Sequence, residues 1–218
     1  MNGEIAFGRV PCSCENQHAA CQLIAVTGGP GAGKTAVLAV ARQLLCQHVI
    51  VLPEAATIVF KGGFWRRESP VGARAAQRAI YCVQRQLEDI VIKDHLAAVG
   101  LCDRGTVDGA VYWPSEGVSY WEAMGVSREA EMARYAAVVH LRTPEAHNGY
   151  DLSNPYRIES ARRAAELDEA ILQAWQSHPR RVVVAAAADF EVKVKHALDA
   201  IGALLPGCCR GLARRPHV

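Results

Sequence analysis

The stretch Gly28-Gly-Pro-Gly-Ala-Gly33-Lys34-Thr35 decides how this sequence of 218 residues folds. It matches the pattern Gly-x-x-x-x-Gly-Lys-Thr, whose glycines let the backbone curl so that N–H groups point at phosphate oxygens. An apolar, partly β-branched run over residues 22–27 precedes it. Apolar residues at helical spacing over residues 34–47 follow it. Because a strand and a helix flank the glycines, the stretch predicts a phosphate-binding loop rather than a chance glycine-rich turn.

Each part of this loop has an expected role toward a nucleoside triphosphate. We expect Lys34 to reach the β- and γ-phosphates as a point charge, and the Thr35 hydroxyl to bind Mg²⁺. The positive end of the following helix dipole adds to the attraction. ATP or GTP is the expected ligand. The residues expected to surround its phosphates are Gly28, Gly29, Pro30, Gly31, Ala32 and Gly33. All of them except Pro30 can donate a backbone N–H to a phosphate oxygen.

Composition limits the classes of partner. Lys and Arg together number 24 against 22 acidic residues, so the net charge of +2 gives no field that suggests nucleic acid. Half of the residues are apolar, enough for one sizeable core. No stretch approaches the apolar length that spans a bilayer, and the N-terminus does not fit a signal sequence. We therefore predict a cytoplasmic protein that binds neither nucleic acid nor membrane, with its oligomeric state left open.

The eight cysteines include no Cys-x-x-Cys pair, and reduced thiols in a cytoplasm are the simplest account of them. Cys12, Cys14, His18 and Cys21 can be interpreted as a zinc cluster. Their spacing fits structural zinc sites poorly, however, so a loose leader before the first strand is the favoured interpretation.

Strands and helices alternate along the chain, which predicts an α/β fold with a parallel sheet between two helical layers. The domain should cover residues 22–205, with a leader over residues 1–21, a lid at about 145–165 and a flexible basic tail over residues 206–218. After the first strand and helix, further strands are expected over residues 49–52, 97–102, 135–141 and 181–186. Further helices are expected over residues 55–60, 72–93 and 158–176.

Polar residues that directly follow strands are the first candidates for chemistry, because ligands of such sheets lie at the carboxyl ends of the strands. Asp103 can order the metal directly or through water. Glu54 can accept a proton from an attacking hydroxyl, or serve as an ordinary carboxylate at a helix start. Arg104 can hold an anionic substrate group. The alternative for Asp103 and Arg104 is a turn at the end of a strand with solvated charges. Asp108 and Tyr112 are weaker candidates, with core packing favoured for Tyr112.

Arginines cluster in the expected lid. Phosphoryl transfer gains from positive charge that closes on the phosphate oxygens, and arginine offers a forked, permanently charged group. Arg157 is the first candidate for this role. Arg162 and Arg163 are the next, although both can instead form ordinary surface pairs with Glu159 on a helix.

A second cluster follows the Gly62-Gly63 break, where Phe64, Trp65, Arg66 and Arg67 combine flat rings with cations. Such a mixture suits stacking on a base or gripping a phosphate, but packing under a loop is equally compatible with it. On the following helix, Gln84 and Arg85 can line an acceptor pocket or face water.

In this set of motifs the chain resembles small AAA-like P-loop proteins related to the ribosylnicotinamide kinase domain and, more distantly, nucleoside and nucleotide kinases. The resemblance covers roughly residues 23–200. It implies a strand order of 2-3-1-4-5, metal contacts from Thr35 and Asp103, a base at Glu54 and lid contacts from Arg157. It rests on the phosphate loop, Glu54-Ala-Ala-Thr57, Asp103-Arg104-Gly105 with Asp108 and Tyr112, His140-Leu-Arg-Thr-Pro144, Asn154, Arg157 and Glu159.

Two functions are compatible with these residues. The favoured one is a kinase that moves the γ-phosphoryl of ATP to an unidentified small, nucleoside- or nucleotide-like acceptor. The alternative is a switch or slow NTPase that binds ATP or GTP and acts through a protein partner. The near-neutral charge disfavours a third function, an ATPase stimulated by nucleic acid.

Overall fold

The computed structural model of the chain describes residues 20–144, 161–187 and 189–210. Five strands in these ranges form one parallel sheet in the order β2-β3-β1-β4-β5, which confirms the predicted fold and strand order. The predicted bounds of the first, second and fourth strands are confirmed to the residue. The strands are β1 (Gln22–Thr27), β2 (Val49–Leu52), β3 (Val99–Asp103), β4 (Tyr135–Leu141) and β5 (Arg181–Val184).

The central strand β1 fixes where the functional residues meet. All of its residues after Gln22 are buried, as expected for a parallel strand covered on both faces. Its register pairs Val26 with Asp103 of β3 and Thr27 with His140 of β4. The carboxyl ends of three strands therefore lie side by side, next to the loop that leaves β1.

Helices connect the strands, and local sequence signals explain where several of them begin. The long helix α3 begins at Pro70, two residues before the predicted start, because Ser69 caps it by accepting from the Gly72 N–H and Pro suits the first helical turn. The helices are α1 (Lys34–Leu44), α2 (Ala55–Lys61), α3 (Pro70–Lys93), α4 (Tyr120–Met124), α5 (Arg128–Ala133), α6 (Ala161–Ala174), α7 (Phe190–Leu204) and α8 (Gly207–Arg210), with a 3₁₀ helix, η1, over Thr106–Tyr112.

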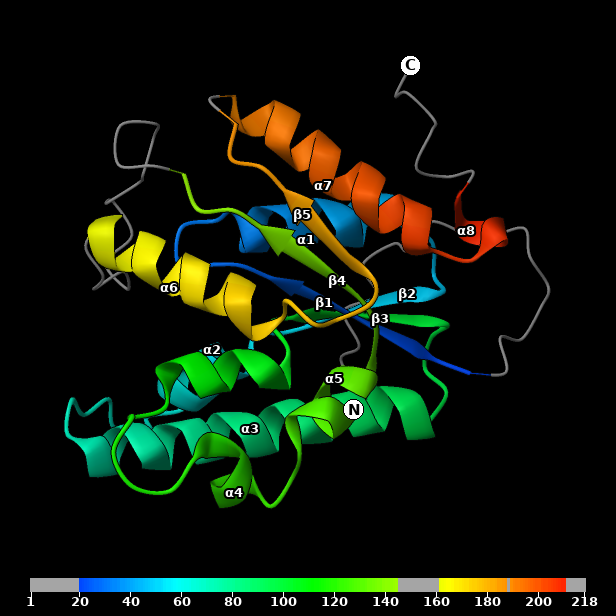
Figure 1. The fold of residues 1–218 in the computed structure, drawn as a ribbon. Helices are drawn as coiled ribbons and strands as arrows, with labels where there is room; N and C mark the ends of the chain where they lie inside the picture. Colours follow the sequence, from blue (N-terminus) through cyan, green and yellow to red (C-terminus); the bar gives the residue numbers. More distant parts are fainter. Residues whose placement is uncertain (1–19, 145–160, 188, 211–218) are drawn as a thin grey trace.

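The helices form two layers around the sheet (Figure 1). Helices α1 and α7 cover one face, where Val37, Leu38 and Ile201 pack on β-strand residues. Helices α3, α5 and α6 lie on the other face with η1, where Ile171 and Trp175 are fully buried. The three-layer architecture is thus as predicted. No described helix has both the length and the apolar content needed to cross a membrane.

The sequence did not reveal four of the short or interrupted elements. Helices α4 and α5 are each too short to show a period, although Ser119 and Ser127 cap them. Helix α7 places Lys193 on its buried face, which interrupts the apolar period. Residues 207–210, in the expected tail, form the helical turn α8.

A buried ion network joins α3 to the start of β4. The Glu88 side chain is fully buried and accepts from Arg134 Nη2 at 2.5 Å, from the Tyr135 hydroxyl at 2.6 Å and from Gln84 Nε2 at 2.8 Å. A buried carboxylate with this many donors holds its neighbours in place. Its removal leaves the buried Tyr135 hydroxyl without this acceptor and weakens the ion pairing of Arg134, which keeps only the longer contacts to Asp89 and Glu131.

We therefore expect Glu88→Ala to lower the free energy of unfolding by about 3 kcal/mol. For a domain of this size that corresponds to a fall in Tm of roughly 6–12 °C, measurable by calorimetry. The matched control is Glu166→Ala at an exposed position of α6, which should leave Tm unchanged. Equal effects of the two substitutions would contradict the proposed role of the network.

Candidate phosphate-binding site

The loop after β1 has the curled backbone that the sequence predicted. Gly28, Gly31 and Gly33 have φ angles of 134°, 76° and 89°, a region that side chains disfavour. A Cβ atom at Gly28 would lie 2.0 Å from the Leu141 carbonyl oxygen, so glycine is required there on packing grounds as well.

Lys34 occupies the centre of this loop. Its Nζ donates hydrogen bonds to the Gly28 and Gly29 carbonyl oxygens, both at 2.9 Å. Burial, and then the charge of Arg104, lower the pKa of Lys34 to about 8, while Asp103 and Glu54 oppose this effect. An ammonium group removed from water in this way attracts a phosphate more strongly than an exposed lysine would.

Asp103 ends β3 beside the loop and has the features of a metal ligand. Its Oδ1 is buried and accepts no hydrogen bond from the described residues. Burial raises the pKa of Asp103 to about 6, against the attraction of Lys34. A buried carboxylate oxygen without a donor fits the oxygen preference of Mg²⁺, and Thr35 is exposed on the first turn of α1. Both roles remain predictions.

Arg104 contacts the residue before α2, the phosphate loop and η1. Its φ of 73° is unusual for a residue other than glycine and turns the side chain back toward the phosphate loop. Its Nε donates to Glu54 Oε1 at 3.0 Å, and its Nη1 donates to the Gly28 carbonyl oxygen at 3.1 Å and to Asp108 Oδ2 at 3.3 Å. Arg104 therefore ties the end of β2 to the loop, and an anionic substrate would have to share these donors.

Glu54 follows β2 and is held in its ionised form. Although burial acts in the opposite direction, Arg104 and the Thr57 hydroxyl lower the pKa of the Glu54 carboxyl. Glu54 stands at the N-cap position of α2, yet its side chain makes no capping hydrogen bond to that helix. Its oxygens instead contact Arg104 and Thr57, and the side chain is 29% exposed. The geometry thus leaves the carboxylate accessible from the site.

Asp108 links this cluster to α6. Its Oδ2 accepts from the Thr27 hydroxyl at 2.5 Å, and its Oδ1 accepts from Trp175 Nε1 at 2.6 Å. The Arg104 guanidinium also lies over the Tyr112 ring, 5.7 Å from its centroid. Asp108 is almost completely buried, so it acts here as a fixed hydrogen-bond acceptor behind the loop.

Asp168 of α6 is a residue of the site that sequence analysis missed. Its Oδ1 accepts from the Gly29 N–H at 2.8 Å and lies 3.0 Å from His140 Nε2, while its Oδ2 pairs with Arg142 Nε at 2.9 Å. The sequence feature that could have revealed Asp168 is its position on the same buried face of α6 as Ala164, Leu167 and Ile171. An acidic residue on an apolar helix face requires a specific partner.

Lys193 of α7, also missed, supports the loop from the opposite helical layer. Its Nζ donates to the Ala32 carbonyl oxygen at 2.8 Å and to the Arg142 carbonyl oxygen at 2.5 Å. Burial lowers the pKa of Lys193 to about 8, with Asp168 opposing. The Thr143 hydroxyl completes the support by donating to the Pro30 carbonyl oxygen at 3.2 Å.

The structure does not bring the described lid arginines to the loop. Arg162 and Arg163 project from the first turn of α6, with side chains 91% and 59% exposed, and both pair with Glu166. Arg157, the first lid candidate, lies outside the described residues, as do Asn154 and Glu159. The predicted lid roles therefore stay predictions.

The aromatic and basic segment after α2 lines a hollow of about 320 Å³. Trp65 is 73% exposed, with the Arg67 guanidinium 5.4 Å from its ring centroid. Gln84 is buried and donates to Glu88 and to the Arg104 carbonyl oxygen, while Arg85 pairs with Glu131. The residues lining the hollow are Gly63, Phe64, Trp65, Arg67, Gly72 and Ala75.

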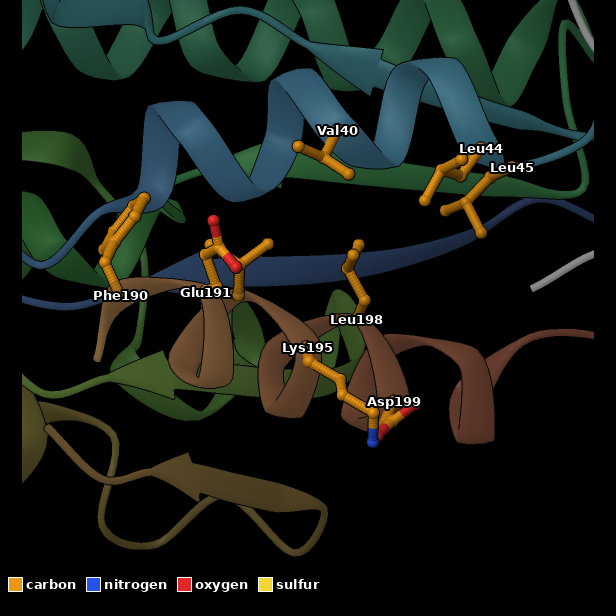
Figure 2. A pocket seen from close by; sticks show the side chains of 9 residues that line it. Val40, Leu44, Leu45, Phe190, Glu191, Lys195, Leu198 and Asp199 are labelled. Atoms are coloured by element: carbon orange, nitrogen blue, oxygen red, sulfur yellow. The ribbon is translucent and has the colours of Figure 1, made fainter. Parts of the chain in front are cut away.

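A larger and mostly apolar groove of about 470 Å³ runs between α1 and α7 (Figure 2). It begins at Phe190, whose ring would lie 2.8 Å from a Cβ atom at Gly33, and continues along Val40 and Leu44 away from the loop. Phe190 thus closes one side of the phosphate loop.

The AAA domain family model matches residues 23–193, which include the loop, Glu54, the Asp103-Arg104 pair and both supporting residues missed by sequence analysis. The chain belongs to the AAA domain family. A comparison with curated proteins found no match.

Solved structures extend this result to the fold. The NadR protein in complex with NR is similar with a TM-score of 0.61 at 15% identity, over 86% of this chain and 52% of that chain. This chain thus spans about half the length of that protein. Shikimate kinase from Acinetobacter baumannii in complex with shikimate has a TM-score of 0.49 at 18% identity, over 84% of this chain and 93% of that chain.

The contacts of Asp168 predict that it stabilises both the fold and the loop. Asp168→Asn removes a buried negative charge from Arg142, and should lower the free energy of unfolding by about 2–4 kcal/mol. It should also weaken ATP binding, because the Gly29 peptide loses a charged acceptor. Glu169→Gln is the matched control, since Glu169 is an exposed partner of the same arginine and should change stability by less than about 0.5 kcal/mol.

Denaturant unfolding and calorimetric titration with Mg·ATP measure the two effects. Asp168→Asn and Glu169→Gln proteins with equal stability and equal ATP affinity would show that Asp168 does not hold the loop.

The raised pKa of Asp103 predicts that its replacement stabilises the fold, whereas the replacement of Asp168 should destabilise it. Because the folded pKa of about 6 exceeds the ordinary 3.8, ionisation of Asp103 opposes folding, and stability is lost as pH rises through this interval. In protein free of metal and nucleotide, Asp103→Asn should therefore raise stability at pH 8 by up to about 3 kcal/mol. The gain should shrink as pH falls through 6, where the wild-type carboxyl becomes protonated.

Thermal unfolding in EDTA at several pH values tests this, with exposed Asp199→Asn as the control. A lower Tm for Asp103→Asn than for wild type at pH 8 would refute the sign of this effect.

Proposed function

We propose that the chain is a phosphotransferase that moves the γ-phosphoryl group of ATP to an oxygen of a small, nucleoside- or nucleotide-like acceptor. The observation that carries the proposal is the ionised, accessible carboxylate of Glu54, fixed through Arg104 to the Gly28 carbonyl oxygen of the phosphate loop. A nucleotide switch needs the loop and the metal, but it has no need of a proton acceptor beside them.

The reaction assigns each group one task. An acceptor oxygen attacks the γ-phosphorus, the bond to the β–γ bridging oxygen breaks, ADP leaves, and the proton of the acceptor passes to Glu54. The low pKa of Glu54 suits a loose transition state, in which the attacking oxygen keeps its proton until late. Lys34 stabilises the phosphate charge, and Mg²⁺, held by Thr35 and Asp103, would neutralise more of it.

The hollow after α2 supports the proposed class of acceptor. The hollow beside Phe64, Trp65 and Arg67 offers an exposed indole ring and a cation, a combination that stacks on bases and binds phosphates. Helix α3, which forms its other side, starts at the carboxyl end of the sheet because it returns the chain to the start of β3. The NadR structure of similar fold holds NR, which supports testing acceptors of this class.

Lys34→Ala should abolish nucleotide-dependent turnover, with a loss of about 100-fold or more, because the buried ammonium group is removed from the phosphates. The assay is release of ADP by the full chain with Mg·ATP or Mg·GTP, alone and with a panel of nucleosides, nucleotides and NR. Unchanged affinity and turnover in Lys34→Ala would contradict the assignment of the loop.

Glu54→Gln separates the kinase from the switch. The amide keeps the shape of the side chain but cannot accept the proton, so acceptor-stimulated turnover should fall about 100-fold or more while ATP affinity stays near that of wild type. Thr57→Val, which removes only the hydroxyl that contacts Glu54, is the matched control and should retain most activity. If no member of the panel raises ADP release above the basal rate, the switch replaces the kinase.

A further inference from the structure

A cluster of three potential metal ligands lies at the end of the molecule opposite the phosphate loop. Cys46 Sγ lies 3.0 Å from Cys209 Sγ, and His48 Nδ1 lies 3.8 Å from the first sulfur and 3.7 Å from the second. All three ligand atoms lie within 4.8 Å of one another. Both cysteines are buried, and His48 is partly exposed, so one side of the cluster is open to solvent.

We propose that Cys46, His48 and Cys209 form a Zn²⁺ site with two thiolates, one imidazole and a fourth position open to water. Zinc is four-coordinate with Zn–S and Zn–N distances of about 2.3 and 2.1 Å, which place two ligand atoms roughly 3.5–3.8 Å apart in a tetrahedron. The two sulfur–nitrogen distances match this spacing, and the sulfur atoms need to separate by only a fraction of an ångström.

The third ligand distinguishes this arrangement from a disulfide. A disulfide requires sulfur atoms about 2.05 Å apart and involves only the two cysteines. The 3.0 Å separation is longer than that bond, and the imidazole nitrogen is nearly equidistant from both sulfurs. A single ion is the ligand that all three atoms can share. Two thiolates with an imidazole select zinc over oxygen-preferring magnesium or calcium.

Two separate segments, the connection between α1 and β2 and the helical turn α8, supply the ligands, so a bound ion would join them. Cys46 follows the end of α1, His48 directly precedes β2, and Cys209 belongs to α8. Figure 1 shows α8 at the end of the sheet where β2 begins, away from the phosphate loop. Helix α1, with 11 residues, separates this cluster from the loop by about 16 Å. The site would therefore fix the C-terminal turn to the core rather than take part in phosphoryl transfer.

Titration of the reduced, metal-free full chain with Co²⁺ tests the proposal, because tetrahedral thiolate-bound Co²⁺ has visible absorption and sulfur charge-transfer bands that Zn²⁺ abolishes. We expect wild-type protein to show these bands at one equivalent. Cys46→Ser and Cys209→Ser should each weaken binding by about tenfold or more. His48→Gln should weaken binding and shift the bands.

The controls are Cys82→Ser, an exposed thiol on α3, and the double variant Cys12→Ser with Cys14→Ser, which removes thiols outside the described residues. Both should bind Co²⁺ as wild type does. Circular dichroism and ATP binding show whether each variant folds. If the buried-cysteine variants do not fold, mass spectrometry of alkylated wild-type protein replaces them, because Zn²⁺ should selectively protect Cys46 and Cys209.

Three results would overturn the proposal. The first is that His48→Gln and both buried-cysteine variants keep the Co²⁺ bands of the wild type. The second is that reduced wild-type protein does not bind Co²⁺. The third is that Cys46 and Cys209 are protected from alkylation equally with and without Zn²⁺. Isolation of a Cys46–Cys209 disulfide together with no metal uptake after reduction would assign the cluster to redox chemistry instead.

Discussion

Both backbone hydrogen-bonding groups of Gly29 are held by buried side chains, and the shape of the phosphate loop depends on these contacts. The Gly29 N–H is bound by Asp168 and its carbonyl oxygen by Lys34. A backbone of glycines has no preferred shape of its own, so the curled form must be imposed by neighbours. Here a buried carboxylate and a buried ammonium group impose it, and both come from positions fixed by the sheet and its helices.

The charges around the loop form two groups with different tasks. Glu54, Asp103 and Arg104 lie at the carboxyl ends of β2 and β3, beside the phosphate loop. Asp168 and Lys193 act from behind, through contacts with loop backbone groups. Glu54 is partly exposed and Asp103 Oδ1 accepts no hydrogen bond from the described residues, whereas both Asp168 oxygens and the Lys193 Nζ contact protein groups. In the proposed phosphotransferase, Glu54, Asp103 and Arg104 would exchange partners with the ligand while Asp168 and Lys193 keep the loop in shape.

Local sequence predicted the elements that carry strong periodicity or a motif. The phosphate loop, the strands β1, β2 and β4, and the positions of Glu54 and Asp103 at strand ends all follow from short-range patterns. Asp168 and Lys193 were missed because their role depends on contacts 139 and 161 residues away in the chain. A charged residue on an apolar helix face signals that some partner exists, but only the packing of α6 and α7 identifies it. The cluster of Cys46, His48 and Cys209 was missed for the same reason, since α8 lies in a segment without period.

Helix α6 touches the site at two points on one face. Asp168 reaches the loop, and one helical repeat of seven residues later Trp175, just past the end of α6, reaches Asp108 behind Arg104. Rotation of the helix about its axis would break both contacts together, so α6, the phosphate loop and η1 should open and close as one cooperative unit. Amide hydrogen exchange along α6 would then report the occupancy of the loop against which this helix packs.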